Sequence, residues 1–171
     1  MLEVSRAFPA YQFIVAEAPG MEDAFYHELL KPYKNVSAVR NETYDLLNQS
    51  AAALVTSGTA TLETALFGVP EVVCYKGNQV SYIIARKLIK VKYISLVNLI
   101  MDREVVKELI QDQLTVANLK TELEGLLFDP QKKKQLAEDY AALKKLLSEG
   151  GNASAKAAKI VVDLVQPAKD A

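Results

Sequence analysis

The chain has 171 residues, of which half are apolar, and its formal net charge is −1 at pH 7. This length and apolar content suffice for one compact domain with a buried core, and a charge so close to zero gives no indication of a nucleic-acid partner. One cysteine and one histidine are too few for a disulfide framework or a cysteine–histidine metal site, and no apolar run approaches the roughly 20 residues of a membrane-spanning helix.

The first fifty residues predict alternating helices and strands. The expected elements are a helix over residues 1–8, a strand over 11–16, a helix over 21–30, a strand over 36–39 and a helix over 43–49. Pro9 ends the first helix, because proline cannot continue a helix. Strands that alternate with helices favour an α/β fold with a doubly wound, mostly parallel sheet.

Residues 53–75 predict a complete βαβ unit. Its expected parts are a buried strand over 53–56, a tight turn at Ser57, Gly58 and Thr59, a helix over 60–67, a stop at 68–70 and a second strand over 71–75. Cys74 lies in the apolar second strand, where we expect a buried, small side chain. Open α/β sheets bind ligands at the carboxyl ends of their strands, so the turn after residue 56 is a candidate site.

This turn and the start of its helix form a candidate phosphate site at Ser57, Gly58, Thr59 and Ala60. The first turn of a helix carries unpaired backbone N–H groups and the positive end of the helix dipole, and glycine lets a ligand approach the backbone. The alternative is that Ser57 or Thr59 only caps the helix, and the Ser-Gly-Thr sequence alone does not decide between them.

Glu63 favours the ligand-binding interpretation. With Thr59 as N-cap, Glu63 is one residue beyond the position that a reciprocal capping box requires. The expected apolar stripe of the helix is Leu62, Ala65, Leu66 and Val69. Glu63 then lies beside the core, one turn above the phosphate site, where a carboxylate is suited to accept hydrogen bonds from ribose hydroxyls.

The next segment combines a basic cluster with three further elements. We expect a helix over 80–88, a strand over 93–96 and a helix over 103–111. The basic cluster is Arg86, Lys87, Lys90 and Lys92. Such a cluster gains about 1 kcal/mol per charge at an anionic lipid surface, although a solvated face is the simpler explanation. Asn98 follows the expected strand, where an amide suits a sugar hydroxyl or a diphosphate oxygen, or else caps a turn.

Three helices without evident chemistry are expected in the last third of the chain, over 115–128, 129–148 and 152–165. Asp129 and Pro130 have the residue types of an N-cap and a first helical residue. Gly150 and Gly151 interrupt the helical pattern. We therefore expect one domain over residues 1–149, followed by a C-terminal helix and tail over 150–171.

Several stretches resemble a known family. The sequence from Ser57 to Glu63 resembles the donor-nucleotide motif of GT-B glycosyltransferases, and residues 70–75, 85–99 and 103–111 are similar to the C-terminal half of the lipid-A-disaccharide synthase family. The resemblance implies a Rossmann-like, UDP-sugar-binding domain. It also implies that Asn98 and Arg103 contact the sugar or the diphosphate. Val97 and the pair Met101-Asp102 depart from the pattern of the family, which leaves the shape of this loop open.

The family resemblance implies the donor-binding half of an inverting glycosyltransferase. Such an enzyme joins UDP-2,3-diacylglucosamine to 2,3-diacylglucosamine 1-phosphate in lipid A biosynthesis, in the cytoplasm and at the inner face of the inner membrane. The resemblance implies that no metal or other cofactor is needed, and the absence of an Asp-x-Asp pair from the sequence agrees with this. The catalytic base, by resemblance, belongs to an N-terminal domain, and a further strand is expected before Met1. The chain therefore resembles a fragment that is inactive alone.

Other functions remain open at this point. The chain could be a non-catalytic module that binds a nucleotide sugar or assembles beside a partner chain. It could also be part of a GT-B-type UDP-sugar epimerase, although the similarity over residues 85–111 argues against this. A doubly wound domain without a ligand is the simplest alternative.

Overall fold

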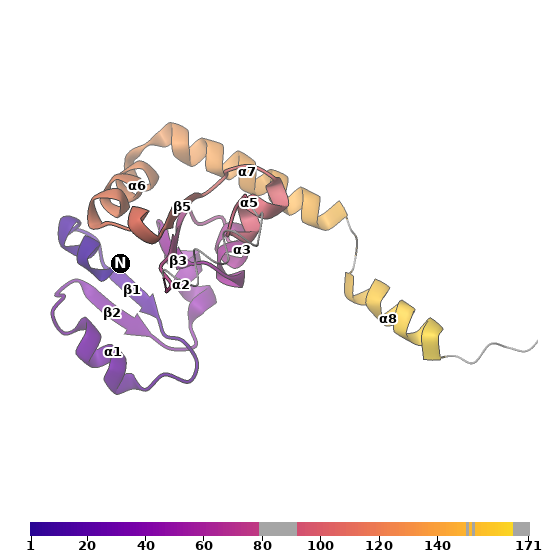
Figure 1. The fold of residues 1–171 in the computed structure, drawn as a ribbon, viewed down its shortest axis with the longest axis horizontal. Coiled ribbons are helices and arrows are strands. Elements are labelled where there is room, and N and C mark those ends of the chain that lie inside the picture. The colour runs from indigo at the N-terminus through magenta and orange to yellow at the C-terminus, as the bar shows by residue number, and fades with distance from the viewer. Residues whose placement is uncertain (79–91, 150, 152, 166–171) are drawn as a thin grey trace, which may run out of the picture.

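The computed structural model describes residues 1–78, 92–149, 151 and 153–165, which form an α/β fold (Figure 1). In chain order the elements are η1 (Leu2–Ala7), β1 (Phe13–Ala16), α1 (Asp23–Leu30), β2 (Val36–Val39), α2 (Thr43–Gln49), β3 (Ala53–Thr56), α3 (Thr59–Leu66), β4 (Glu71–Tyr75), α5 (Leu96–Met101), β5 (Lys107–Ile110), η2 (Gln111–Gln113), α6 (Val116–Phe128), α7 (Pro130–Glu149) and α8 (Ala153–Val165). The expected helix over 80–88 lies outside the described residues.

The described strands form two parallel sheets. β1 pairs with β2, and β4 lies between β3 and β5. This confirms the predicted α/β class with parallel strands. Among the described residues the two sheets are separate, because β1 and β3 do not pair with each other.

The predicted βαβ unit is present, with its helix starting one residue earlier than expected. α3 begins at Thr59, so Gly58 and not Thr59 is the N-cap residue, and Gly68 ends the unit's helix with a φ of +80°. The buried face of α3 consists of Thr61, Thr64 and Ala65. Leu66, expected in the apolar stripe, is 37% exposed, because the helix presents its threonine face to the core.

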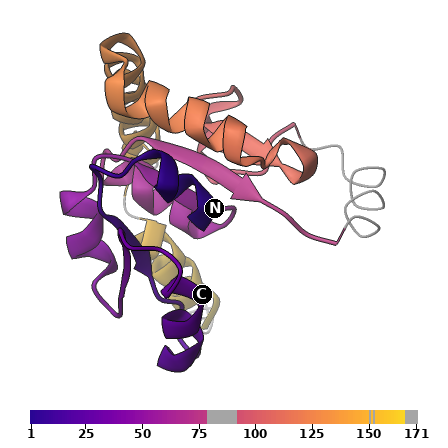
Figure 2. The same cartoon turned by 90° about the vertical axis from the view of Figure 1, so that its left-hand side faces the viewer.

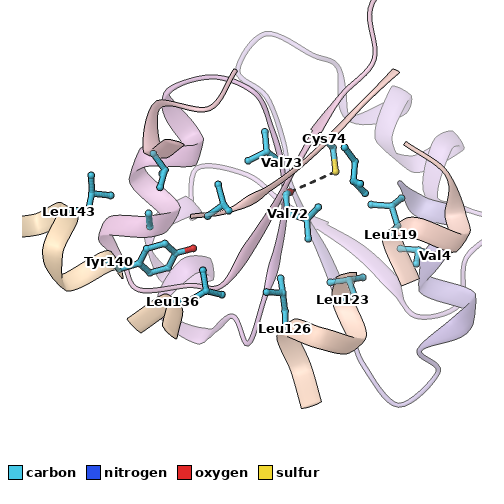
Figure 3. Close-up of a cluster of buried hydrophobic side chains, with 14 of the residues drawn as sticks. Val4, Val72, Val73, Cys74, Leu119, Leu123, Leu126, Leu136, Tyr140 and Leu143 are labelled. Atoms are coloured by element: carbon cyan, nitrogen blue, oxygen red, sulfur yellow. Dashed lines mark hydrogen bonds between the residues drawn. The ribbon is translucent and has the colours of Figure 1, made fainter. Parts of the chain in front are cut away.

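The core lies between the three-stranded sheet and the C-terminal helices. α6 buries Leu119, Leu123 and Leu126 at helical spacing, and it packs on β4 and β5. Figure 3 shows these leucines facing Val72 and its neighbours on β4, and Figure 2 shows α6 and α7 on one side of that strand. Each fully buried leucine contributes about 1.5–3 kcal/mol through the hydrophobic effect.

The prediction for residues 93–111 is wrong, since helix and strand are exchanged there. The Ser95 hydroxyl accepts a hydrogen bond from the Asn98 N–H at 3.2 Å, and this cap starts a helix, α5, in place of a strand. Residues 107–110 form β5, with Lys107 opposite Val72. The apolar residues of this segment fit helical spacing, but Glu108 and Leu109 are both buried, as in a strand covered on both faces.

The C-terminal helices agree with the predicted ranges to within one residue. Asp129 caps α7, with its Oδ1 accepting hydrogen bonds from the N–H groups of Gln131 at 2.8 Å and Lys132 at 3.2 Å. On α8, the side chains of residues 154–165 are exposed. Figure 1 shows α8 apart from the rest of the fold. Among the described residues no helix has the length and apolar character needed to span a membrane.

Candidate functional site

The turn after β3 is anchored on two sides. The Ser57 N–H donates to the Cys74 carbonyl at 3.4 Å, which ties the turn to the neighbouring strand β4. The Ser57 hydroxyl donates to the carbonyl of Ile94 at 3.0 Å, which ties it to the segment before α5. Both donors of Ser57 are therefore used within the protein, and its hydroxyl offers a ligand only its lone pairs.

The first turn of α3 provides a set of backbone donors at the carboxyl end of β3. The N–H groups of Gly58, Thr59 and Ala60 have no acceptor among the described residues, as is usual at the start of a helix. Gly58 has φ +158° and ψ −164°, and a Cβ there would have no atom within 4 Å, so the space beside the turn is open. This arrangement suits an anion such as a phosphate.

Threonine hydroxyls stabilise this turn from inside. Thr61 Oγ1 donates to the Gly58 carbonyl at 2.8 Å, and Thr64 Oγ1 donates to the Ala60 carbonyl at 2.8 Å. Both threonines are buried, so these bonds are shielded from water. They fix the carbonyl groups of the first turn and leave its N–H groups directed outward.

Glu63 lies on the same side of α3 as Thr59, one helical turn further along. Its side chain is partly buried and has no hydrogen bond or ion pair to any described residue. The carboxylate can therefore accept hydrogen bonds from a ligand that is held at the first turn. This is the position that the sequence predicts for ribose recognition.

Asn98 does not have a free amide. It is fully buried, and its Oδ1 accepts from the N–H groups of Val105 at 2.7 Å and Val106 at 3.0 Å. Its Nδ2 donates to the Val106 carbonyl at 2.8 Å and to Glu108 Oε1 at 2.9 Å. All four hydrogen-bonding positions of the amide are used, so a ligand contact would require one of these bonds to break.

Glu108 is a residue of this region that the sequence does not point to. The residue is 9% exposed, and its carboxylate accepts from the N–H groups of Ile94, at 3.0 and 3.2 Å, and Ser95, at 2.9 Å, as well as from Asn98. No arginine or lysine pairs with Glu108 among the described residues, so backbone and amide donors alone compensate its burial. A glutamate flanked by the apolar pairs Val105-Val106 and Leu109-Ile110 is the signal that could have identified it.

Arg103 lies at the opposite end of the strands, near their amino ends. It precedes the amino end of β5, whereas Ser57 follows the carboxyl end of β3, and both strands run parallel to β4. Its guanidinium forms two hydrogen bonds to Asp139 on α7, at 2.6 and 3.2 Å. The bond to Asp139 raises the pKa of Arg103, and the bond to Arg103 lowers the pKa of Asp139. The structure thus does not bring Arg103 together with the turn after β3.

Of the predicted basic cluster, the structure describes Lys92. Its ammonium group pairs with Asp102 at 2.9 Å, and both side chains are largely exposed. The hydrogen bond to Asp102 raises the pKa of Lys92. Arg86, Lys87 and Lys90 lie outside the described residues. In the part of the chain that is described, no three His, Cys, Asp or Glu side chains are placed to share a metal ion.

Comparison with known proteins gives consistent results. The family model described as lipid-A-disaccharide synthetase matches residues 1–162. The lipid-A-disaccharide synthase of Psychromonas ingrahamii is 38% identical over 169 residues, which cover 97% of this chain and 43% of the relative. That of Acidobacterium capsulatum is 40% identical over 121 residues, 70% of this chain and 30% of the relative. That of Geobacter sulfurreducens is 32% identical over 164 residues, 95% of this chain and 42% of the relative. The chain spans less than half the length of these relatives.

Proposed function

This chain belongs to the lipid-A-disaccharide synthetase family, and on that basis we propose that it forms the donor-binding half of an inverting glycosyltransferase. The proposed reaction transfers 2,3-diacylglucosamine from UDP to the hydroxyl of 2,3-diacylglucosamine 1-phosphate. The proposal assigns donor binding to this chain and the base that deprotonates the acceptor to another part of the full protein.

The observation that carries the proposal is the set of free N–H groups at the first turn of α3. They lie at the carboxyl end of a parallel strand, the edge at which α/β sheets bind ligands. We propose that Gly58, Thr59 and Ala60 bind the diphosphate of UDP and that Glu63 accepts hydrogen bonds from the ribose. Ser57 and Asn98 then act by holding the surrounding backbone, whereas Arg103 acts away from this turn, through its ion pair with Asp139.

Negative charge develops on the UDP diphosphate as the bond to the sugar breaks. N–H groups fixed in advance around that position stabilise the charge without reorganising, which lowers the barrier of the transfer. The dipole of α3 adds to this effect. The 171 residues alone are expected to form no disaccharide, because the proposal assigns the base to another part of the full protein.

A nucleotide titration tests the proposal. UDP, GDP and ADP are titrated into the 171-residue chain, into Glu63→Ala and into Glu124→Ala, and binding is followed by calorimetry and amide NMR shifts. Glu124 is an exposed glutamate on α6 and serves as the matched control. We expect UDP-selective binding that Glu63→Ala removes and Glu124→Ala retains, with shifts at residues 58–60.

Two results would contradict the proposal. One is a folded chain that binds none of the nucleotides. The other is UDP binding that shifts the amides of a different part of the chain and does not respond to Glu63→Ala. Formation of disaccharide by the chain alone would contradict only the assignment of the base to another part of the protein.

The acylated substrates also suggest where the full protein works. We propose that it contacts the inner face of the inner membrane, with Arg86, Lys87, Lys90 and Lys92 near the lipid head groups. Binding of the chain to vesicles that contain anionic phosphatidylglycerol, compared with vesicles of phosphatidylcholine alone, tests this contact. Equal binding to both kinds of vesicle would contradict it.

A further inference from the structure

We infer that Glu108 is a positioning residue for the nucleotide site, acting through the segment Ile94–Asn98 and the hydroxyl of Ser57. This inference rests on the proposed function, because it concerns the same turn after β3. Glu108 lies on β5, two strands away from β3, so its effect on the turn is indirect.

The first step is the set of hydrogen bonds by which Glu108 holds the segment before α5. Its two carboxylate oxygens accept from the N–H groups of Ile94 and Ser95, at distances from 2.9 to 3.2 Å. Hydrogen bonds to an ionised group inside a protein are stronger than neutral ones, and removing a buried acceptor leaves its donors unpaired. The backbone at Ile94 is therefore held in one place by Glu108.

The second step is the amide of Asn98, which supports Glu108 from the other side. Asn98 Nδ2 donates to Glu108 Oε1 at 2.9 Å, and its Oδ1 holds the N–H groups of Val105 and Val106. Asn98 thus connects α5 to the start of β5 and orients the carboxylate. Both residues are buried, so water does not replace these bonds.

The third step leads to the turn itself. The Ile94 carbonyl accepts the hydroxyl of Ser57 at 3.0 Å, and Ser57 is the residue that precedes the free N–H groups of the first turn of α3. Fixing Ile94 therefore fixes the side of the turn that does not pair with β4. When one of the acceptors at Glu108 is lost, we expect the backbone at Ser57 and Gly58 to shift relative to the first turn of α3.

The test combines Glu108→Gln with Ser57→Ala and the double variant in the full 171-residue chain. Glu104→Gln is the matched control, because Glu104 carries the same charge nearby but is exposed and pairs with Lys107. UDP affinity is measured by calorimetry, and the amide signals of residues 57–60 are followed by NMR without ligand. If Glu108→Gln does not fold, Glu108→Asp takes its place, since it keeps the charge but shortens the side chain.

We expect Glu108→Gln to shift the amide signals of Ser57 and Gly58 and to weaken UDP binding about tenfold, whereas Glu104→Gln does neither. In the Ser57→Ala background the same substitution is expected to change UDP affinity less than about twofold, because the connection is already broken. Unchanged signals at 57–60, or fully additive losses of affinity, would overturn the inference. If the unsubstituted chain binds no UDP, the proposed function fails. The ligand-free amide signals of residues 57–60 in Glu108→Gln then decide alone whether Glu108 positions the turn.

Discussion

Arg103 and Asp139 form an ion pair with two hydrogen bonds, of 2.6 and 3.2 Å, which joins the loop before β5 to α7. The aspartate side chain is 9% exposed and the arginine side chain is 46% exposed. Asp139 also accepts from Gln135 at 3.0 Å. The pair therefore fastens α7 to the sheet and is only partly open to solvent.

Arg103→Ala is expected to lower the free energy of unfolding by about 1 kcal/mol, a value reduced by the solvent exposure of the arginine. The pKa of Asp139 is lowered in the folded state, so its stabilisation is present above the unfolded pKa and is lost as the pH falls through the folded pKa. Urea unfolding at pH 7 and at pH 3 should therefore show that the free energies of unfolding of Arg103→Ala and of the unsubstituted chain differ less at pH 3 than at pH 7. Asp102→Asn, at an exposed pair, is the control. A loss of UDP affinity without a loss of stability would contradict the structural role.

Glu71 predicts a pH dependence of stability. The residue is 1% exposed, its carboxyl group has no hydrogen-bond partner among the described residues, and burial raises the pKa of this group to about 9. The folded chain thus binds a proton that the unfolded chain releases above about pH 4.5, so stability falls as the pH rises towards 9, by up to about 1.4 kcal/mol per pH unit. Glu71→Gln should remove this slope in urea unfolding between pH 5 and pH 8, and Glu138→Gln on the surface of α7 should keep it. An equal slope in Glu71→Gln would show that the carboxyl group is hydrated or paired.

Asn98→Ala should destabilise the chain strongly. The substitution leaves the N–H groups of Val105 and Val106 without their acceptor and removes one of the donors to the Glu108 carboxylate, and each buried unpaired group costs about 1–3 kcal/mol. Urea unfolding is expected to show a loss of at least about 3 kcal/mol. The exposed Asn118, whose side-chain amide donates to the Gln113 carbonyl at 2.8 Å, provides a control as Asn118→Ala with a loss near or below about 1 kcal/mol. A stable Asn98→Ala chain that fails only in UDP binding would support the direct ligand contact predicted from the sequence.

Cys74 should be unreactive while the chain is folded. It is 2% exposed, and burial raises the pKa of its thiol to about 11, so the reactive thiolate is scarce at pH 8. Labelling with a thiol reagent is expected to be slow in buffer and fast in urea above the unfolding midpoint. Ala117→Cys places a thiol at an exposed position of α6 and should label rapidly in both conditions. Rapid labelling of Cys74 in buffer would indicate local opening of β4.

The βαβ unit could be predicted from the sequence because its signals are local. A short apolar strand, a Ser-Gly-Thr turn and a Gly-Val-Pro stop each constrain a few consecutive residues, and β3 and β4 have the predicted bounds. Over residues 93–111 the structure has a helix followed by a strand, where the sequence predicts a strand followed by a helix. This difference arises from contacts between residues distant in the sequence, which local sequence patterns do not reveal. Ser95 caps α5, and Glu108, ten or more residues away, takes the N–H groups that a strand at 93–96 would need.

The candidate site likewise has features that the local sequence predicts and features that depend on distant residues. The free N–H groups at 58–60 and the unpaired Glu63 follow from the position of the turn, which the sequence indicates. The partners of Asn98 and Arg103 do not, because Glu108 and Asp139 come from other elements of the fold. A polar side chain in a loop has the same sequence signal whether it faces a ligand or another residue.

The packing of η1 on α6 has a consequence for how the chain folds. Val4 and Leu119 belong to one core cluster, and Figure 3 shows them beside each other. On the ribosome, η1 therefore emerges long before the helix that covers it, and it cannot be buried until α6 has been made. Closing a loop between residues so far apart in the sequence costs chain entropy before the contact forms, and contacts of this kind slow folding.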